Sequence, residues 1–86
     1  MTIPMDPKTL EMLSLAGRKR GLVEYGTIDL VKRGLLEEAL DLIDLGFLVR
    51  TAREEEGEEK LYYRITEKGL EYLRRILDFA HQNRPR

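Results

Sequence analysis

Few side chains in this 86-residue chain have the chemistry of a catalytic group. There is no cysteine, and the single histidine, His81, has no serine or cysteine nucleophile near it in the sequence. Ser14, the single serine, falls inside a predicted helix. No glycine-rich phosphate-binding loop follows a predicted strand. The sequence therefore predicts a protein that is not an enzyme and that needs no cofactor.

Five glutamates lie close together between Glu54 and Glu59, and carboxylate clusters can bind divalent metal ions. A calcium-binding loop needs alternating ligands and a final bidentate glutamate at a fixed spacing, and this segment lacks that pattern. We therefore expect no metal site. Because the segment is strongly polar and contains Gly57, it predicts an exposed turn over residues 54–59.

Basic and aromatic side chains have a second kind of chemistry, because they bind the phosphates and bases of nucleic acids. Lys32 and Arg33 precede a predicted helix, at whose N-terminus a phosphate can bind. Arg50 and Arg64 are expected to be cross-strand neighbours, with an exposed Tyr62 between them. The alternative is that these charges are solvated and paired with nearby acids. The candidate DNA-binding residues are Arg18, Lys19, Arg20, Lys32, Arg33, Arg50, Arg53, Tyr62 and Arg64.

The net charge of −1 hides three segments of different sign. Residues 1–33 carry +2, residues 34–59 carry −7 and residues 60–86 carry +4. Any nucleic-acid contact must therefore be local. Charged residues make up 36% of the chain and only two side chains are amides, a composition typical of thermophile proteins. No apolar run reaches membrane-spanning length and no secretory signal is present, so we expect a cytoplasmic protein of one domain.

The first half of the chain predicts helices. Asp6 as N-cap and Pro7 at the first helical position predict a helix from Pro7 to Gly17. A short strand is expected at Leu22–Val23. Residues 28–33, capped by Thr27, and residues 35–45 are predicted to form two helices separated by Gly34. One uninterrupted helix over residues 27–45 is the alternative, because one glycine inside a helix costs only about 1 kcal/mol.

The second half predicts a β-hairpin followed at once by a helix. Side chains alternate in character over residues 47–52 and 60–66, on either side of the acidic turn. Thr66 is the predicted N-cap of a helix over residues 67–82. Tyr72, Ile76 and Phe79 form a second apolar stripe on this helix, beside a stripe of leucines, and we expect them to form a dimer interface.

Two segments of this half resemble the winged helix-turn-helix family, especially its small archaeal DNA-binding and regulatory members. The first is Leu45-Gly46-Phe47-Leu48, where a helix ends and a strand begins. The second is Tyr63-Arg64-Ile65-Thr66-Glu67-Lys68-Gly69-Leu70, where the last helix begins. The resemblance implies an α+β, mostly helical fold: a three-helix core, a wing at about 46–66 and a fourth helix at about 67–82. Residues 1–6 would be an extension, 7–82 the domain and 83–86 a frayed tail.

The resemblance also implies function: DNA binding, transcriptional regulation and a homodimer through the terminal helix. In this family the third helix enters the major groove. Here, however, the residues left for its outer face are acidic and would be repelled by phosphates: Glu37, Glu38, Asp41 and Asp44. We therefore expect DNA contact through the basic groups near the second helix, the turn and the hairpin. The alternative is a protein-interaction module whose acidic third helix and wing bind a basic partner.

Overall fold

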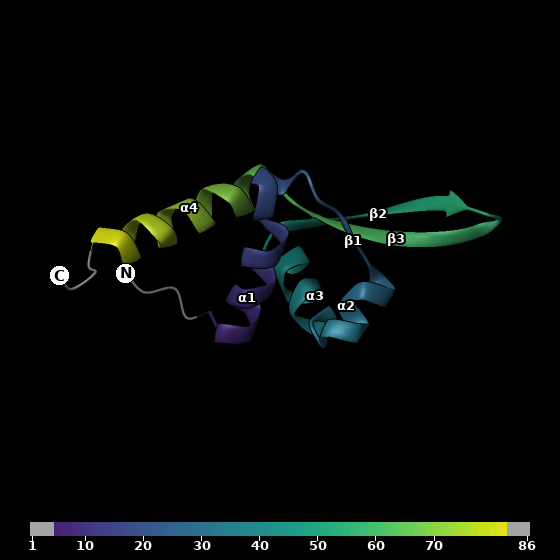
Figure 1. The fold of residues 1–86 in the computed structure, drawn as a ribbon, viewed down its shortest axis with the longest axis horizontal. Coiled ribbons are helices and arrows are strands. Elements are labelled where there is room, and N and C mark those ends of the chain that lie inside the picture. The colour runs from purple at the N-terminus through teal and green to yellow at the C-terminus, as the bar shows by residue number, and fades with distance from the viewer. Residues whose placement is uncertain (1–4, 83–86) are drawn as a thin grey trace.

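The computed structural model describes residues 5–82, with side chains as far as Ile76. Within this range four α-helices and a three-stranded antiparallel sheet confirm the predicted α+β class. A 3-10 segment, η1, follows the first helix (Figure 1). The elements are α1 (Pro7–Ala16), η1 (Arg18–Gly21), β1 (Tyr25–Gly26), α2 (Thr27–Arg33), α3 (Leu36–Asp44), β2 (Leu48–Glu55), β3 (Glu58–Ile65) and α4 (Glu67–Gln82).

The helices of the first half begin and end close to their predicted positions. α1 begins at Pro7, whose fixed φ suits the first helical position. Asp6 is at the N-cap, but its side chain makes no capping hydrogen bond. Gly34 adopts φ 70° and ends α2, so residues 27–45 form two helices and the one-helix alternative is wrong. Glycine reaches this left-handed conformation without the clash that a Cβ would make.

The predicted strand at Leu22–Val23 is wrong, because the first strand lies at Tyr25–Gly26. Leu22 directly follows the turn formed by η1 and is 84% exposed. Pairing with β3 begins only where Tyr25 lies opposite Tyr63. The Tyr25 hydroxyl donates a hydrogen bond of 3.3 Å to the Leu15 carbonyl, which ties the strand to the end of α1.

The hairpin is longer than the sequence predicted, and its turn is shorter. β2 and β3 pair without interruption from Leu48↔Ile65 to Glu55↔Glu58. The turn consists of Glu56 (φ 53°) and Gly57 (φ 79°) alone, and two positive φ angles are typical of the type I′ turn that matches strand twist. The acidic turn expected over residues 54–59 is therefore mostly strand. In Figure 1 the hairpin extends well beyond the helices.

The core lies between the helices and one face of the sheet (Figure 1). It includes Met12, Leu13, Leu30 and Leu42, all with no exposed surface, and Tyr63, 2% exposed. Direct partners in an antiparallel ladder share a face, so Leu48 with Ile65 and Arg50 with Tyr63 define the helix-covered face. The opposite, open face carries the alternate residues of each strand.

The junction of hairpin and α4 is fixed by Thr66 and Gly69. The Thr66 hydroxyl accepts a hydrogen bond of 3.0 Å from the Gly69 amide, which confirms the predicted N-cap. The same hydroxyl donates to the Gly46 carbonyl at 2.7 Å. A Cβ at Gly69 would lie 2.4 Å from the Phe47 carbonyl oxygen, so only glycine lets α4 begin this close to the start of the hairpin.

Candidate nucleic-acid interface

The most unusual backbone in the molecule carries the basic residues that follow α1. Lys19 (φ 52°, ψ 35°), Arg20 (φ 58°, ψ 33°) and Gly21 (φ 78°) are three successive residues in the left-handed region. Each non-glycine residue there costs about 1 to 2 kcal/mol. Arg18, Lys19 and Arg20 are all exposed, so the strained conformation presents three cations to solvent. We refer to residues 18–21 as the basic turn.

The basic turn is held in place by its glycine. Gly21 is buried, and a Cβ there would lie 2.5 Å from Cγ2 of Ile65 and 3.5 Å from Cδ1 of Leu70. The turn therefore rests on the end of β3 and the first part of α4. Strained conformations of this kind persist only where the surrounding structure enforces them, and here the packing of Gly21 does so.

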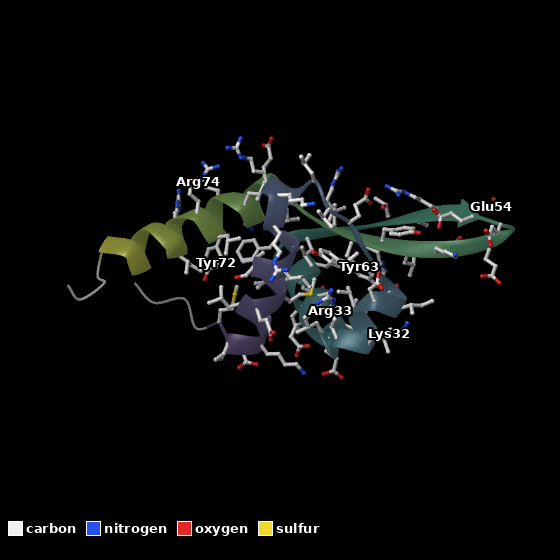
Figure 2. All side chains as sticks on the ribbon, in the orientation of Figure 1. Lys32, Arg33, Glu54, Tyr63, Tyr72 and Arg74 are labelled. Atoms are coloured by element: carbon white, nitrogen blue, oxygen red, sulfur yellow. The ribbon has the colours of Figure 1, made fainter. Side chains whose placement is uncertain are left out.

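Arg74 on α4 lies one helical turn beyond Leu70, which packs against the basic turn, and it is not among the predicted DNA-binding residues. It lies four residues after Leu70, so the two share one side of the helix, and Leu70 is the residue that contacts the turn. Arg74 is exposed and points away from the helices beneath the sheet (Figure 2). Its neighbour Arg75 is paired with Glu71 at 2.7 Å. The i, i+4 spacing from Leu70 is the sequence signal that could have identified Arg74.

The strand register separates the candidate residues of the hairpin. Arg64 is the partner of Val49, and Arg50 is the partner of Tyr63. Arg50 and Arg64 therefore lie on opposite faces of the sheet, and the prediction that they are cross-strand neighbours is wrong. In this register every even-numbered residue of β2 is paired with an odd-numbered residue of β3. Two even-numbered residues, such as Arg50 and Arg64, therefore never share a face of the sheet. Tyr62 shares the open face with Arg64.

Tyr62 is occupied by contacts within the hairpin. The Arg53 guanidinium lies 4.9 Å from the centre of its ring, and its hydroxyl donates a hydrogen bond to Glu55. This hydrogen bond raises the pKa of Tyr62, with smaller contributions from desolvation and from the negative charge of Glu55. Arg53 is also paired with Glu24. Because the Arg53 contact covers part of the ring, base stacking on Tyr62 would require Arg53 to move.

Lys32 and Arg33 lie apart from the other candidates, at the end of α2. Both are exposed, and the Arg33 guanidinium lies 5.9 Å from the centre of the Tyr25 ring. In Figure 2 they lie on the helical side of the molecule, whereas Arg74 lies on the opposite side. The nine candidate residues thus divide among the basic turn, the hairpin and the end of α2, and they do not form one continuous site.

The exposed side of α3 is acidic and partly apolar. Glu37, Asp41 and Asp44 are exposed, as predicted, together with Leu40 (39%) and Leu45 (48%). Leu40 lies near the boundary of the buried side of α3, one turn beyond half-buried Leu36. We refer to these five residues as the acidic α3 surface.

Glu38, also predicted on this outer face, faces α1 instead. Its side chain is only 13% exposed and lies 3.9 Å from the Lys8 ammonium group. The prediction that it belongs to the partner-binding acids is therefore wrong. Glu38 directly precedes buried Ala39 and lies where α3 meets α1. Lys8 of α1 supplies the opposite charge there.

The expected dimer stripe of α4 is only partly free. Tyr72 stacks on Phe47 within the same chain, with ring centres 4.7 Å apart and planes inclined by 21°. Tyr72 therefore belongs to the margin of the domain core, which corrects the expectation that it forms a separate interface. Ile76 is half-buried, and the side chain of Phe79 lies outside the described residues.

Two features are absent from the part of the chain that the structure describes. Among the side chains that the structure describes, no group of three or more histidine, cysteine or carboxylate residues is placed to hold a metal ion. None of the helices within residues 5–82 combines the length and the apolar character needed to cross a bilayer.

No family model matches the chain, and neither a curated protein nor a solved structure is significantly similar to it.

Proposed function

We propose that this chain is a winged helix-turn-helix protein that binds duplex DNA and acts as a small transcriptional regulator. The helix order and the strand order β1-β3-β2 are compatible with that fold. The observation that carries the proposal is the basic turn, where the backbone is strained while three cations are presented to solvent. Strained backbone of this kind, enforced by the packing around it, is found most often at functional sites.

The DNA contact proposed here lies at the basic turn and Arg74. The three exposed cations of the basic turn and exposed Arg74 would attract phosphates, whereas the acidic α3 surface would repel them. Phosphate contacts orient a protein on DNA but carry no sequence information. Binding is therefore expected to be strongly salt-dependent and only weakly selective for sequence.

Fluorescence anisotropy with a labelled random-sequence duplex tests this proposal. With about four phosphate contacts from one copy, affinity should fall at least about a hundredfold between about 50 and 200 mM salt, and more steeply if two copies are bound. Failure to bind at the lower concentration would contradict the proposal.

We also propose that two copies associate through α4, beyond the segment occupied by the core. Tyr72, the first residue of the expected stripe, is stacked on Phe47, so the proposed interface begins at half-buried Ile76. A dimer would present two basic turns to one duplex, and linked sites bind more tightly than single ones.

A second candidate function is a protein-interaction module. It is favoured by the acidic α3 surface, where exposed Leu40 and Leu45 lie among three carboxylates. Apolar anchors surrounded by charge suit a basic protein partner, which the carboxylates would attract. This candidate would replace DNA binding if the duplex measurement fails at low salt.

A further inference from the structure

A groove of about 540 Å³ lies between the start of α2 and residues 58–62, the part of β3 that follows the hairpin turn. Ile28, Leu61 and Tyr62 contribute its apolar surface, and Ile28 is 68% exposed. Asp29, Glu58 and Glu59 contribute carboxylates, with Lys60 as the one cation among the lining residues. Neither the basic turn nor α3 lines this groove, so it is separate from both surfaces described above.

One edge of β3 is left without a partner along this groove. β1 pairs with β3 only at Tyr25↔Tyr63 and Gly26↔Tyr62, whereas β2 pairs with β3 as far as Glu58. On the β1 side, residues 58–61 therefore have no strand partner within the part of the chain that the structure describes. An unpaired edge with free backbone donors and acceptors is a template for an additional strand.

The backbone direction at this edge follows from Leu61. The Thr27 hydroxyl donates a hydrogen bond of 3.5 Å to the Leu61 carbonyl oxygen, so this carbonyl points toward α2 and already has a partner there. Backbone groups alternate along an antiparallel strand, and those of Glu59 therefore point the same way. The groove thus combines an apolar side chain at Ile28, available backbone groups and a net negative charge.

We propose that this groove binds an extended segment of a partner protein that carries both basic and apolar side chains, and that the segment adds as a strand beside β3. Main-chain hydrogen bonds to the amide and carbonyl of Glu59 and to the amide of Leu61 would supply affinity, as in other cases of strand addition. Apolar side chains of the segment would cover Ile28, and its basic side chains would pair with Asp29, Glu58 and Glu59. Charge complementarity selects a cationic segment and disfavours nucleic acid.

A fluorescein-labelled peptide of alternating lysine and valine tests the proposal, with an alternating glutamate and valine peptide as the charge control. Ile28→Ser should weaken binding of the lysine peptide by about tenfold, because burial of an isoleucine side chain contributes more than 1.4 kcal/mol. Val31→Ser is the matched control, since Val31 is 58% exposed on the same helix but does not line the groove. It should change the affinity by less than about twofold.

Hydrogen exchange distinguishes strand addition from contact through side chains alone. The amides of Glu59 and Leu61 should exchange more slowly when the lysine peptide is bound. The proposal is wrong if the peptide fails to bind, if both peptides bind equally, if the two serine variants behave alike or if these amides are unaffected. It is also wrong if the unliganded protein forms a dimer that Ile28→Ser dissociates, because the occupant would then be a second copy.

Discussion

The basic turn and the acidic α3 surface differ in both charge and backbone strain. In the basic turn, three cations occupy a backbone that is partly left-handed and held by one buried glycine. In α3, carboxylates occupy an ordinary helix that would adopt the same conformation with many other residues. The conformation of a helix therefore says little about binding until its exposed charges are known, whereas a strained basic segment is itself grounds for a hypothesis of function.

The largest effect should come from Gly21→Ala. A Cβ there combines an unfavourable φ with a contact of 2.5 Å to Ile65, so we expect a loss of about 2 to 4 kcal/mol in the free energy of unfolding. Gly57→Ala is the matched control, because Gly57 has nearly the same φ but nothing within 4 Å of its Cβ position. It should lose only about 1 kcal/mol. Urea unfolding measures both, and equal losses would mean that the turn is not anchored on the core.

Replacing Lys19 and Arg20 together by glycine should separate stability from binding. Two phosphate contacts are removed, so the affinity for duplex DNA should fall about tenfold at low salt. Relief of left-handed strain should at the same time raise the free energy of unfolding by about 1 kcal/mol. Lys32→Gln with Arg33→Gln removes the same charge elsewhere and should weaken binding by less. If the α2 pair matters more, the DNA contact lies at the helical side.

Ile76→Glu with Phe79→Glu tests how many basic turns act together. If α4 forms the dimer, this variant should be monomeric by analytical ultracentrifugation and should bind duplex about tenfold more weakly through lost avidity. Tyr72 is left intact because its contact with Phe47 belongs to the fold. An unchanged particle mass in a folded variant would refute the dimer.

Neutralising the acidic α3 surface should change DNA binding only slightly. Glu37→Gln with Asp41→Asn removes two exposed charges, and a surface that does not meet the duplex should alter its affinity by no more than about threefold at physiological salt. A much larger gain in affinity, measured by the same anisotropy assay, would mean that α3 lies close to the duplex. The acidic α3 surface, and not only the basic turn, would then face the DNA.

The smallest effect concerns Tyr62 and pH. A free tyrosine ionises near pH 10, and the hydrogen bond to Glu55 raises the pKa of Tyr62 above that value in the folded chain. The stabilising contribution is thus complete below about pH 10 and is lost as the pH rises through the raised pKa. The difference between the absorbance titrations of the unmodified chain and the Tyr62→Phe variant isolates the ionisation of Tyr62, and its midpoint should lie above pH 10. A midpoint at or below pH 10 would contradict the hydrogen bond.

The sequence predicted those parts of the fold that local chemistry determines. Pro7, Gly34 and Thr66 mark helix boundaries through rules that act within a few residues, and all three do so in the structure. The strand register is not local in this sense, so the pairing of Arg50 with Arg64 was mispredicted. The turn length also escaped prediction, because the strand pairing of residues 54–55 with 58–59 outweighs the preference of glutamates for a loop.

The sequence identified the basic residues of the candidate site but not how they are arranged in space. Arg18, Lys19 and Arg20 are conspicuous in the sequence, whereas their left-handed backbone arises from how Gly21 packs against Ile65. Arg74 joins them only because α4 lies beside the turn. The groove beside β3 depends on where β1 lies, and the sequence placed the first strand at Leu22–Val23 instead of Tyr25–Gly26.

The salt dependence of duplex binding, compared between the unmodified chain and the Lys19→Gly, Arg20→Gly variant, tests the central claim most directly. The slope of log affinity against log salt counts the phosphates neutralised by the protein. If the basic turn is the DNA contact, the variant should lose about two from the magnitude of this slope for each basic turn that is bound to the duplex. An unchanged slope would show that DNA, if bound at all, is bound elsewhere on the molecule.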